Sequence, residues 1–353
     1  MAVMTVSQDM KTAAIVGASG YTGVEMIRLA MAHPRLTIVA LTGARHAGRA
    51  AADVHPALLG CDLPDLVRVK DVDWDDVDVA FCCLPHGASE EVVAEIAGEV
   101  ETVIDLSADF RLKDKALYEA TYGRSHGNAT LLEEAVYGLS EWARDQLPGA
   151  GLVACPGCFP TCTLLALAPL LAEGVIDPED IRITAMTGVS GAGRKAHEAF
   201  SFAELSDSAH PYGLDGHRHA PEMDQFLTGL SDMDVQVSFV PQLVPMNRGM
   251  VATIFVRRAG AANADLRQIY ADVYAEQPFV QLLPEGIAPK TRNVRGSNHC
   301  HLNAFEDRGD GRSVLVSAID NLTKGSSGQA IQNYNLTQGW DECLGLEMTP
   351  LFP

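Results

Sequence analysis

The sequence predicts an α/β protein of two domains, in which a parallel-sheet domain precedes an α+β domain. The chain has 353 residues, roughly twice the length of a common single domain. Its first half alternates short apolar runs with segments of helical spacing, whereas after about residue 155 the apolar runs become longer and richer in Val. No stretch rich in Pro, Gly and Ser separates the halves, so we expect the two domains to pack closely.

The elements of the first half predict a parallel sheet. Strands are expected at 11–17, 36–41, 77–84 and 102–106, because each is a short apolar run of strand length. Helices are expected from Gly20 until the His33-Pro34 step, and over 89–97. Strands that alternate with helices at this interval are typical of βαβ units.

The elements of the second half predict a mixed α+β domain. Helices are expected at 161–173, 266–274 and 327–340, and strands at 181–189, 235–244, 250–257 and 313–319. The strands at 235–244 and 250–257 are joined by the short segment 245–249. We therefore expect them to form an antiparallel pair.

Composition excludes several classes of partner and compartment. The chain carries 26 Lys and Arg against 46 Asp and Glu, a formal net charge of −20, so nucleic-acid and anionic-membrane binding are not expected. The longest nearly apolar stretch, 162–172, is too short to span a bilayer, and residues 1–10 do not resemble a secretory signal. The eight cysteines do not have the spacing of a disulfide scaffold or of a zinc site. We therefore expect a reducing, cytoplasmic location and no metal.

A glycine-rich turn follows the first expected strand. The segment GASGYTG places Gly17, Gly20 and Gly23 between a strand and a helix, with Ser19, Tyr21 and Thr22 between them. Glycines there permit a tight turn, and the helix N-terminus presents free N–H groups to a pyrophosphate. The segment predicts a dinucleotide site; the alternative is a turn that serves packing alone.

The end of the second expected strand indicates which dinucleotide is bound. An acidic residue at this place binds the ribose 2′-hydroxyl of NAD. The segment TGARHAGR (42–49) has no acid and contributes Arg45 and Arg49, which favours the 2′-phosphate of NADP. The alternative is a solvated loop.

Cys158 is the candidate nucleophile. In CPGCFPT (155–161) it lies just before the expected apolar helix, where the dipole and free N–H groups lower a thiol pKa and stabilise an oxyanion. A redox pair of Cys158 with Cys155 or Cys162 is the weaker alternative.

Two histidines provide candidate acid–base groups. In GHRHAPE (216–222), His217 and His219 flank an Arg ahead of a helix that begins with Pro. Imidazole exchanges protons near neutral pH. Glu222, one turn beyond His219, is expected to orient that ring, which favours His219 over His217.

Two loops are candidates for binding substrate anions. DLSADFR (105–111) follows a strand and ends in Arg111. SGAGRK (190–195) is glycine-rich and contributes Ser190, Gly191 and Arg194. Planar guanidinium groups suit phosphate and carboxylate, so Arg111 and Arg194 are assigned to the substrate. Each loop could equally be plain surface.

Seven segments, in order along nearly the whole chain, carry a family resemblance. They are GASGYTG (17–23), LPHG (84–87), DLSADFR (105–111), PGCFPT (156–161), SGAGR (190–194), GHRHAPE (216–222) and NLTKGSSGQA (321–330). Together they resemble the N-acetyl-γ-glutamyl-phosphate reductases of arginine biosynthesis. Cys155 is a departure, since many members have Asn there.

The resemblance implies fold, cofactor and assembly. It implies a Rossmann NADP-binding domain, residues 1–157 completed by 321–353, and a catalytic and oligomerisation domain, 158–320, of the glyceraldehyde-phosphate and aspartate-semialdehyde dehydrogenase type. It places Pro85, Gly191 and Asn321 near NADPH, and it implies a homodimer or homotetramer.

The resemblance also implies the reaction. Cys158 would attack N-acetyl-L-glutamyl 5-phosphate, and NADPH would reduce the resulting thioester to N-acetyl-L-glutamate 5-semialdehyde. His219 or His217 would hold the thiolate as an ion pair and supply a proton. Ser190 and Glu222 join Arg111 and Arg194 as candidate substrate-binding residues. The rival hypotheses are aspartate-semialdehyde dehydrogenase and a catalytically silent NADP-binding redox sensor.

Overall fold

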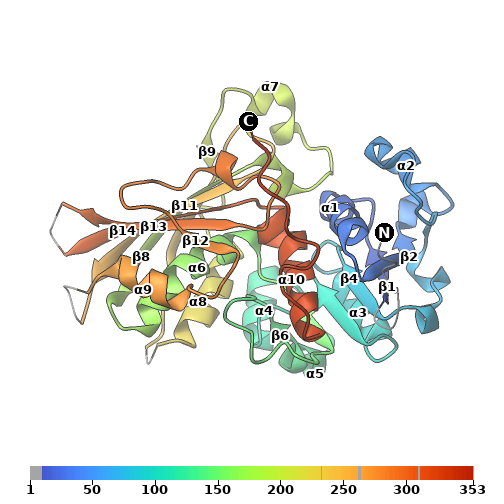
Figure 1. Ribbon diagram of the computed structural model, residues 1–353, viewed down its shortest axis with the longest axis horizontal. Helices are drawn as coiled ribbons and strands as arrows, with labels where there is room; N and C mark the ends of the chain where they lie inside the picture. Colours follow the sequence, from blue (N-terminus) through green and yellow to red (C-terminus); the bar gives the residue numbers. More distant parts are fainter. Residues whose placement is uncertain (1–9, 232, 261–263, 309–310, 353) are drawn as a thin grey trace, which may run out of the picture.

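The computed structural model describes residues 10–231, 233–260, 264–308 and 311–352. Two sheets of seven strands form its framework (Figure 1). Helix α10 (Gly328–Thr337), near the C-terminus, lies between the elements of the first half and the sheet of the second half. The predicted α/β class with two kinds of sheet is confirmed.

The first sheet is parallel throughout, in the order β3-β2-β1-β4-β5-β7-β6. Its strands are β1 (Lys11–Val16), β2 (Leu36–Thr42), β3 (Leu66–Val67), β4 (Val79–Cys82), β5 (Thr102–Asp105), β6 (Val136–Tyr137) and β7 (Leu152–Ala154). The four expected strands are confirmed as β1, β2, β4 and β5. The order reverses between β1 and β4, and ligands of open α/β sheets bind at such a point, outside the carboxyl ends of the strands.

The helices of the first half connect these strands. They are α1 (Tyr21–Ala32), α2 (Ala51–Val54), α3 (Ser89–Ile96), α4 (Lys115–Tyr122) and α5 (Ala129–Glu134). Helix α1 begins directly after the Gly-rich turn, with Gly20 as its N-cap, and ends at His33 ahead of Pro34, as expected from the sequence.

The second sheet is mixed, in the order β12-β13-β14-β11-β8-β10-β9. Its strands are β8 (Ile176–Thr187), β9 (His210–Pro211), β10 (Ser238–Leu243), β11 (Met250–Arg258), β12 (Val280–Leu282), β13 (Cys300–Asp307) and β14 (Arg312–Ile319). The helices of this half are α6 (Cys158–Ala172), α7 (Phe202–Leu205), α8 (Ala220–Thr228), α9 (Leu266–Val273) and α10.

The expected pairing of β10 with β11 is wrong. Both strands pair with β8, which lies between them, β10 parallel to it and β11 antiparallel. The segment between β10 and β11 crosses the end of β8, where the N–H groups of Val189 and Ser190 donate to the carbonyls of Met246 and Asn247. The short connection therefore forms hydrogen bonds to the loop after β8 and does not form a hairpin.

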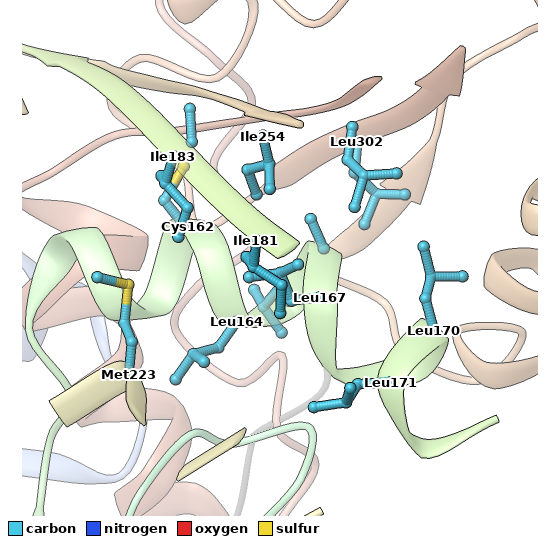
Figure 2. Packing of buried hydrophobic residues seen from close by; sticks show 14 of the residues in the cluster. Cys162, Leu164, Leu167, Leu170, Leu171, Ile181, Ile183, Met223, Ile254 and Leu302 are labelled. Carbon is cyan, nitrogen blue, oxygen red and sulfur yellow. The ribbon is translucent and has the colours of Figure 1, made fainter. Parts of the chain in front are cut away.

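Helix α6 forms the centre of the second core. Nearly all of its side chains are buried, and Pro169 lies within it. Leu164, Leu167 and Leu170 belong to one apolar cluster with Ile183 of β8 and Ile254 of β11, which Figure 2 shows together with Met223 of α8. A helix that is apolar on every side is typical of one enclosed by protein. This burial fixes the N-terminus of α6, where Cys158 lies.

The chain returns to the first sheet at its end. A π-helical turn, Thr323–Ser327, precedes α10, and Ile331 and Tyr334 of α10 join the apolar cluster that contains Ile15 of β1. Ser327 Oγ donates to Thr22 O at 3.1 Å, and Thr323 Oγ1 donates to Glu25 Oε1 at 3.0 Å. Segments about 300 residues apart in the sequence are thus joined at the start of α1.

Helices α6, α8 and α9 lie on the same side of the second sheet (Figure 1). Side chains alternate along β8 and β11, with Ile183 and Ile254 buried but Met186 42% and Phe255 43% exposed. In the part of the chain that the structure describes, no helix is both long enough and apolar enough to cross a membrane.

Candidate active site

Cys158 is the first residue of helix α6. Gly157 forms the N-cap, with an extended backbone at φ −63° and ψ 154°. The sequence places the start of the helix at Thr161, whereas the structure begins it three residues earlier. Pro160 is tolerated there because the N–H groups of a first helical turn have no partner within the helix.

The carboxylate of Glu222, in the first turn of α8, holds the residue before the nucleophile. It is fully buried, and its Oε1 accepts hydrogen bonds from Gly157 N–H at 2.8 Å and from the Tyr137 hydroxyl at 2.9 Å. Its Oε2 lies 3.5 Å from Arg111 Nη1. Glu222 therefore fixes the backbone on which Cys158 is mounted.

Arg111 connects the loop after β5 to the same place. Its Nε donates to Cys155 O at 2.8 Å and its Nη2 to Leu106 O at 3.0 Å. The guanidinium is buried beside Gly157, because a Cβ added to that glycine would lie 3.0 Å from Arg111 Nη1. The structure thus brings together Arg111, Glu222 and Cys158, three candidate site residues that come from separate segments of the sequence.

His219 lies over the same glycine. A Cβ at position 157 would approach His219 Nε2 to 2.6 Å, so only glycine leaves room for the ring. Its ring centroid is 4.8 Å from that of His217 and 5.8 Å from that of Phe159. Both histidines therefore border the N-terminus of α6, with His219 nearer to the Gly157 backbone.

Glu222 does not orient His219 as the sequence suggests. Its oxygens bond to Tyr137, Gly157 and Arg111, and among the described residues His219 Nδ1 has no hydrogen-bond partner. The preference for His219 rests instead on its position against Gly157.

Burial governs the protonation of this cluster. It raises the pKa of the Cys158 thiol to about 11, an effect that the charge of Arg111 and the Phe159 N–H only partly offset. It lowers the pKa of His217 to about 4, assisted by Arg218, and that of His219 well below its usual value, assisted by His217. The helix N-terminus therefore does not produce the low thiol pKa expected from the sequence, and the resting pair is thiol and neutral imidazole.

The Gly-rich turn has the shape of a phosphate cradle. Gly17 has φ +87°, and a Cβ there would lie 2.7 Å from Cys83 O, so a side chain at this position would meet backbone. A Cβ at Gly23 would likewise meet Gly17 O. Among the residues that the structure describes, no side chain caps the N-terminus of α1, which leaves its first N–H groups to an anion. The residues present therefore fit a dinucleotide at the β1–β4 switch point.

The loop after β8 reaches this crevice together with Asn321. Asn321 Nδ2 donates to Ser190 Oγ at 3.0 Å, and its Oδ1 accepts from Gly249 N–H at 2.8 Å. A Cβ at Gly191 would lie 3.8 Å from Asn321 Nδ2. Ser190, Gly191 and Asn321 thus form one group, although they come from distant segments.

The remaining candidates lie in the first half of the chain or form hydrogen bonds to it. Arg45 and Arg49 are exposed after β2, where Arg49 Nη2 donates to Asp53 O at 3.0 Å, and Pro85 is exposed after β4. Arg194 donates to Ser19 O and Val54 O, each at 3.1 Å. Among the described residues it makes no hydrogen bond to the cluster around Cys158, where the sequence assigns it.

Sequence reasoning missed three contributors to the site. Tyr137 supports Glu222, and Gly325 of the π-helical turn lies so near α6 that a Cβ there would be 2.8 Å from Cys158 Cβ. Arg248 pairs with Glu25 and, at 3.4 Å, with Asp320. Tyr137 and Arg248 have no local sequence signal. Gly325 lies in NLTKGSSGQA, one of the segments that carry the resemblance, but nothing in that segment indicates its contact with Cys158.

Comparisons with known proteins agree with this geometry. Residues 12–150 match the family described as semialdehyde dehydrogenase, NAD binding domain, and residues 158–321 match the semialdehyde dehydrogenase dimerisation domain. A crystal structure of aspartate semialdehyde dehydrogenase II complexed with ASA from Vibrio cholerae has a TM-score of 0.71 at 18% identity, covering 94% of this chain and 98% of that one. An aspartate semialdehyde dehydrogenase with NADP from Candida albicans has a TM-score of 0.67 at 17% identity, covering 93% and 98%. These likenesses show the fold.

Sequence relatives are much closer. N-acetyl-gamma-glutamyl-phosphate reductase of Rhodospirillum rubrum is 48% identical over 345 residues, which cover 96% of this chain and 98% of that protein. The probable chloroplastic N-acetyl-gamma-glutamyl-phosphate reductase of Arabidopsis thaliana is 47% identical over 340 residues, covering 96% and 84%. With this identity over nearly the whole length, and with the thiol, imidazole and dinucleotide cradle in place, the chain belongs to the N-acetyl-γ-glutamyl-phosphate reductase family.

Proposed function

We propose that the chain reduces N-acetyl-L-glutamyl 5-phosphate with NADPH to N-acetyl-L-glutamate 5-semialdehyde, phosphate and NADP⁺, in arginine biosynthesis. The observation that carries the proposal is that the His219 imidazole and the Arg111 guanidinium both lie against Gly157, the residue directly before Cys158. The π-helical turn joins this cluster to the dinucleotide cradle, because Gly325 lies against Cys158 and Ser327 Oγ donates to Thr22 O. Acyl transfer to a thiol followed by reduction needs both sites.

The first step is acyl transfer to sulfur. Neutral His219 accepts the thiol proton as Cys158 attacks the acyl carbon, the new C–S bond forms, and the C–O bond to phosphate breaks. Because burial keeps His219 neutral and Cys158 protonated, deprotonation accompanies attack instead of preceding it. Backbone N–H groups in the first turn of α6 stabilise the oxyanion that develops on the carbonyl oxygen.

The second step releases the aldehyde. NADPH held at the Gly-rich turn would supply the hydride that reduces the thioester carbonyl. The N-terminus of α6 again stabilises the negative charge on oxygen, and as the C–S bond breaks His219 returns its proton to the sulfur. His217, which contacts His219, is the alternative proton carrier.

The residues of the two binding sites follow from their positions. Cofactor contacts are assigned to the Gly-rich turn and the loops around it: Gly17, Ser19, Gly20, Tyr21, Thr22, Gly23, Pro85, Gly191 and Asn321. Arg45 and Arg49, exposed where β2 ends, are assigned to the 2′-phosphate. Arg111 and Ser190 are assigned to the substrate's anionic groups, and Glu222 supports them by holding Arg111.

The larger organisation is inferred on the same basis. Residues 1–157 with 321–353 form the NADP-binding domain, since Ile331 and Tyr334 share a core with Ile15, and 158–320 form the catalytic domain. Met186 and Phe255 are exposed on one face of the second sheet, which supports a homodimer or homotetramer built on that face. We place the protein in the cytoplasm.

One experiment tests the reaction against its nearest rivals. NADPH oxidation is followed spectroscopically with N-acetylglutamyl phosphate and, in parallel, with aspartyl phosphate. Turnover of the acetylated substrate alone is expected. Preference for aspartyl phosphate would instead indicate an aspartate-semialdehyde dehydrogenase, and NADPH binding without turnover of either would indicate a silent NADP-binding protein.

A further inference from the structure

Arg194 bridges the two halves of the molecule at the Gly-rich turn. It belongs to the loop after β8, yet its Nη1 donates to Ser19 O and its Nη2 to Val54 O, both at 3.1 Å. Gly193, with φ +81°, precedes it and adopts a backbone conformation that favours glycine. The guanidinium therefore lies against the segment that cradles the dinucleotide.

The neighbouring histidine leaves the charge of Arg194 intact. His55 Nε2 lies 3.1 Å from Ala18 O, which can only accept, so Nε2 carries the proton. In the neutral ring Nδ1 is then an acceptor, and it lies 3.5 Å from Arg194 Nη1. Burial lowers the pKa of His55, and the charge of Arg194 lowers it further, so the ring stays neutral at physiological pH.

The positive charge also lacks a carboxylate partner. In the described ranges, Arg194 bonds only to two carbonyls and one imidazole, and no carboxylate oxygen lies within the 4.0 Å of an ion pair. A guanidinium has five N–H groups, so two remain free, which is the number that a bidentate phosphate contact requires.

We propose that Arg194 binds a phosphate group of the dinucleotide, so that the second domain supplies part of the cofactor site. The proposal rests on the NADPH dependence of the proposed function, and it moves Arg194 from the substrate to the cofactor. Arg111 already places a guanidinium beside Gly157. Arg194 instead contacts Ser19 of the turn, together with Val54 and His55 at the end of α2. His55 in turn bonds to Ala18 O of the turn. Cofactor binding would then also favour one arrangement of the two domains.

Equilibrium titration without acyl phosphate tests this proposal separately from the reaction. NADPH and NADH are titrated by fluorescence into the wild type, Arg194→Ala, Arg194→Lys and Lys195→Ala. Lys195 is the matched control, since it is the adjacent exposed cation of the same loop. Arg194→Ala is expected to raise the Kd for NADPH about tenfold or more, because a charged bidentate contact is lost. Arg194→Lys should recover part of the affinity, and Lys195→Ala should change it less than twofold.

The two cofactors identify which phosphate is bound. If Arg194→Ala lowers the affinity for NADPH but not for NADH, and lowers that for 2′,5′-ADP but not for ADP, Arg194 is assigned to the 2′-phosphate beside Arg45 and Arg49. Equal weakening of NADPH and NADH assigns it to the pyrophosphate. An Arg194→Ala variant whose Kd for both stays within twofold of wild type overturns the proposal, and a raised KM for the acyl phosphate would then return the residue to the substrate.

Discussion

Replacing Gly325 with Ala tests whether the π-helical turn positions the nucleophile. The added Cβ would lie 2.8 Å from Cys158 Cβ and 3.2 Å from Ile319 Cδ1, whereas ordinary contacts begin near 3.4 Å. To restore an ordinary contact, the turn and the start of α6 must therefore separate by about 0.6 Å, the difference between 2.8 and 3.4 Å. Displacement of a reacting group by about 1 Å costs roughly 100-fold in rate, so we expect kcat to fall about tenfold to a hundredfold.

The assay separates a misplaced thiol from a damaged fold. The kcat for NADPH oxidation, the Kd for NADPH and the rate of Cys158 alkylation by iodoacetamide are measured on the same preparation. Helix propensity alone favours Ala over Gly, so loss of activity would not follow from the local backbone. The control is Gly151→Ala, because a Cβ at Gly151 meets nothing within 4 Å. A folded Gly325→Ala enzyme with kcat within twofold of wild type would refute the reasoning.

Three further predictions concern chemistry and stability. Cys158→Ser should abolish turnover while leaving NADPH affinity nearly unchanged, and more than about a tenth of wild-type activity would exclude a thioester route. Since burial lowers the pKa of His219, the imidazole stays a base until the pH falls well below 6.5. The acidic limb of the kcat/KM profile of the wild type should therefore lie well below pH 6.5, and this limb should be lost in His219→Asn. Arg28 and Arg248 overcome burial to hold the pKa of Glu25 at about 2 against the usual 4.5, which is worth about 3 kcal/mol. That stability is present above pH 4.5 and is lost as the pH falls toward 2. In urea unfolding, Glu25→Gln should therefore have a lower free energy of unfolding than wild type at pH 7, and the difference should shrink as the pH is lowered.

Local patterns were enough to predict the elements that carry strong periodicity. Strands β1, β2, β4 and β5 and helices α1 and α3 lie where the apolar runs place them, since each is long enough to show its period. Strands β3 and β6 have two residues each and are defined only by their partners in the sheet. The pairing of β10 with β11 failed because the sequence cannot show that β8, about 50 residues earlier, inserts between them.

The candidate site shows the same division between local and distant information. Cys158, Arg111 and the histidine pair were predictable from residue type and local context. The structure places Arg111 and His219 against Gly157, and His217 against His219. The partners of Glu222 were not, because Tyr137 and Gly157 approach it from segments 85 and 65 residues away. The thiol pKa was misjudged for a related reason: a helix N-terminus is visible in sequence, but the burial that outweighs it is a property of the assembled fold.

The return of the last helix to the first sheet has a consequence for synthesis of the chain. The core around Ile15 includes Ile331 and Tyr334, which leave the ribosome only after the whole second half has been made. At roughly 5–20 residues per second, the unfinished apolar surface beside α1 stays uncovered for about 10–30 s. Nascent chains should therefore depend on chaperones during this interval. A stop codon in place of Gly328, which removes α10, should yield aggregated protein even though every residue proposed for catalysis is present.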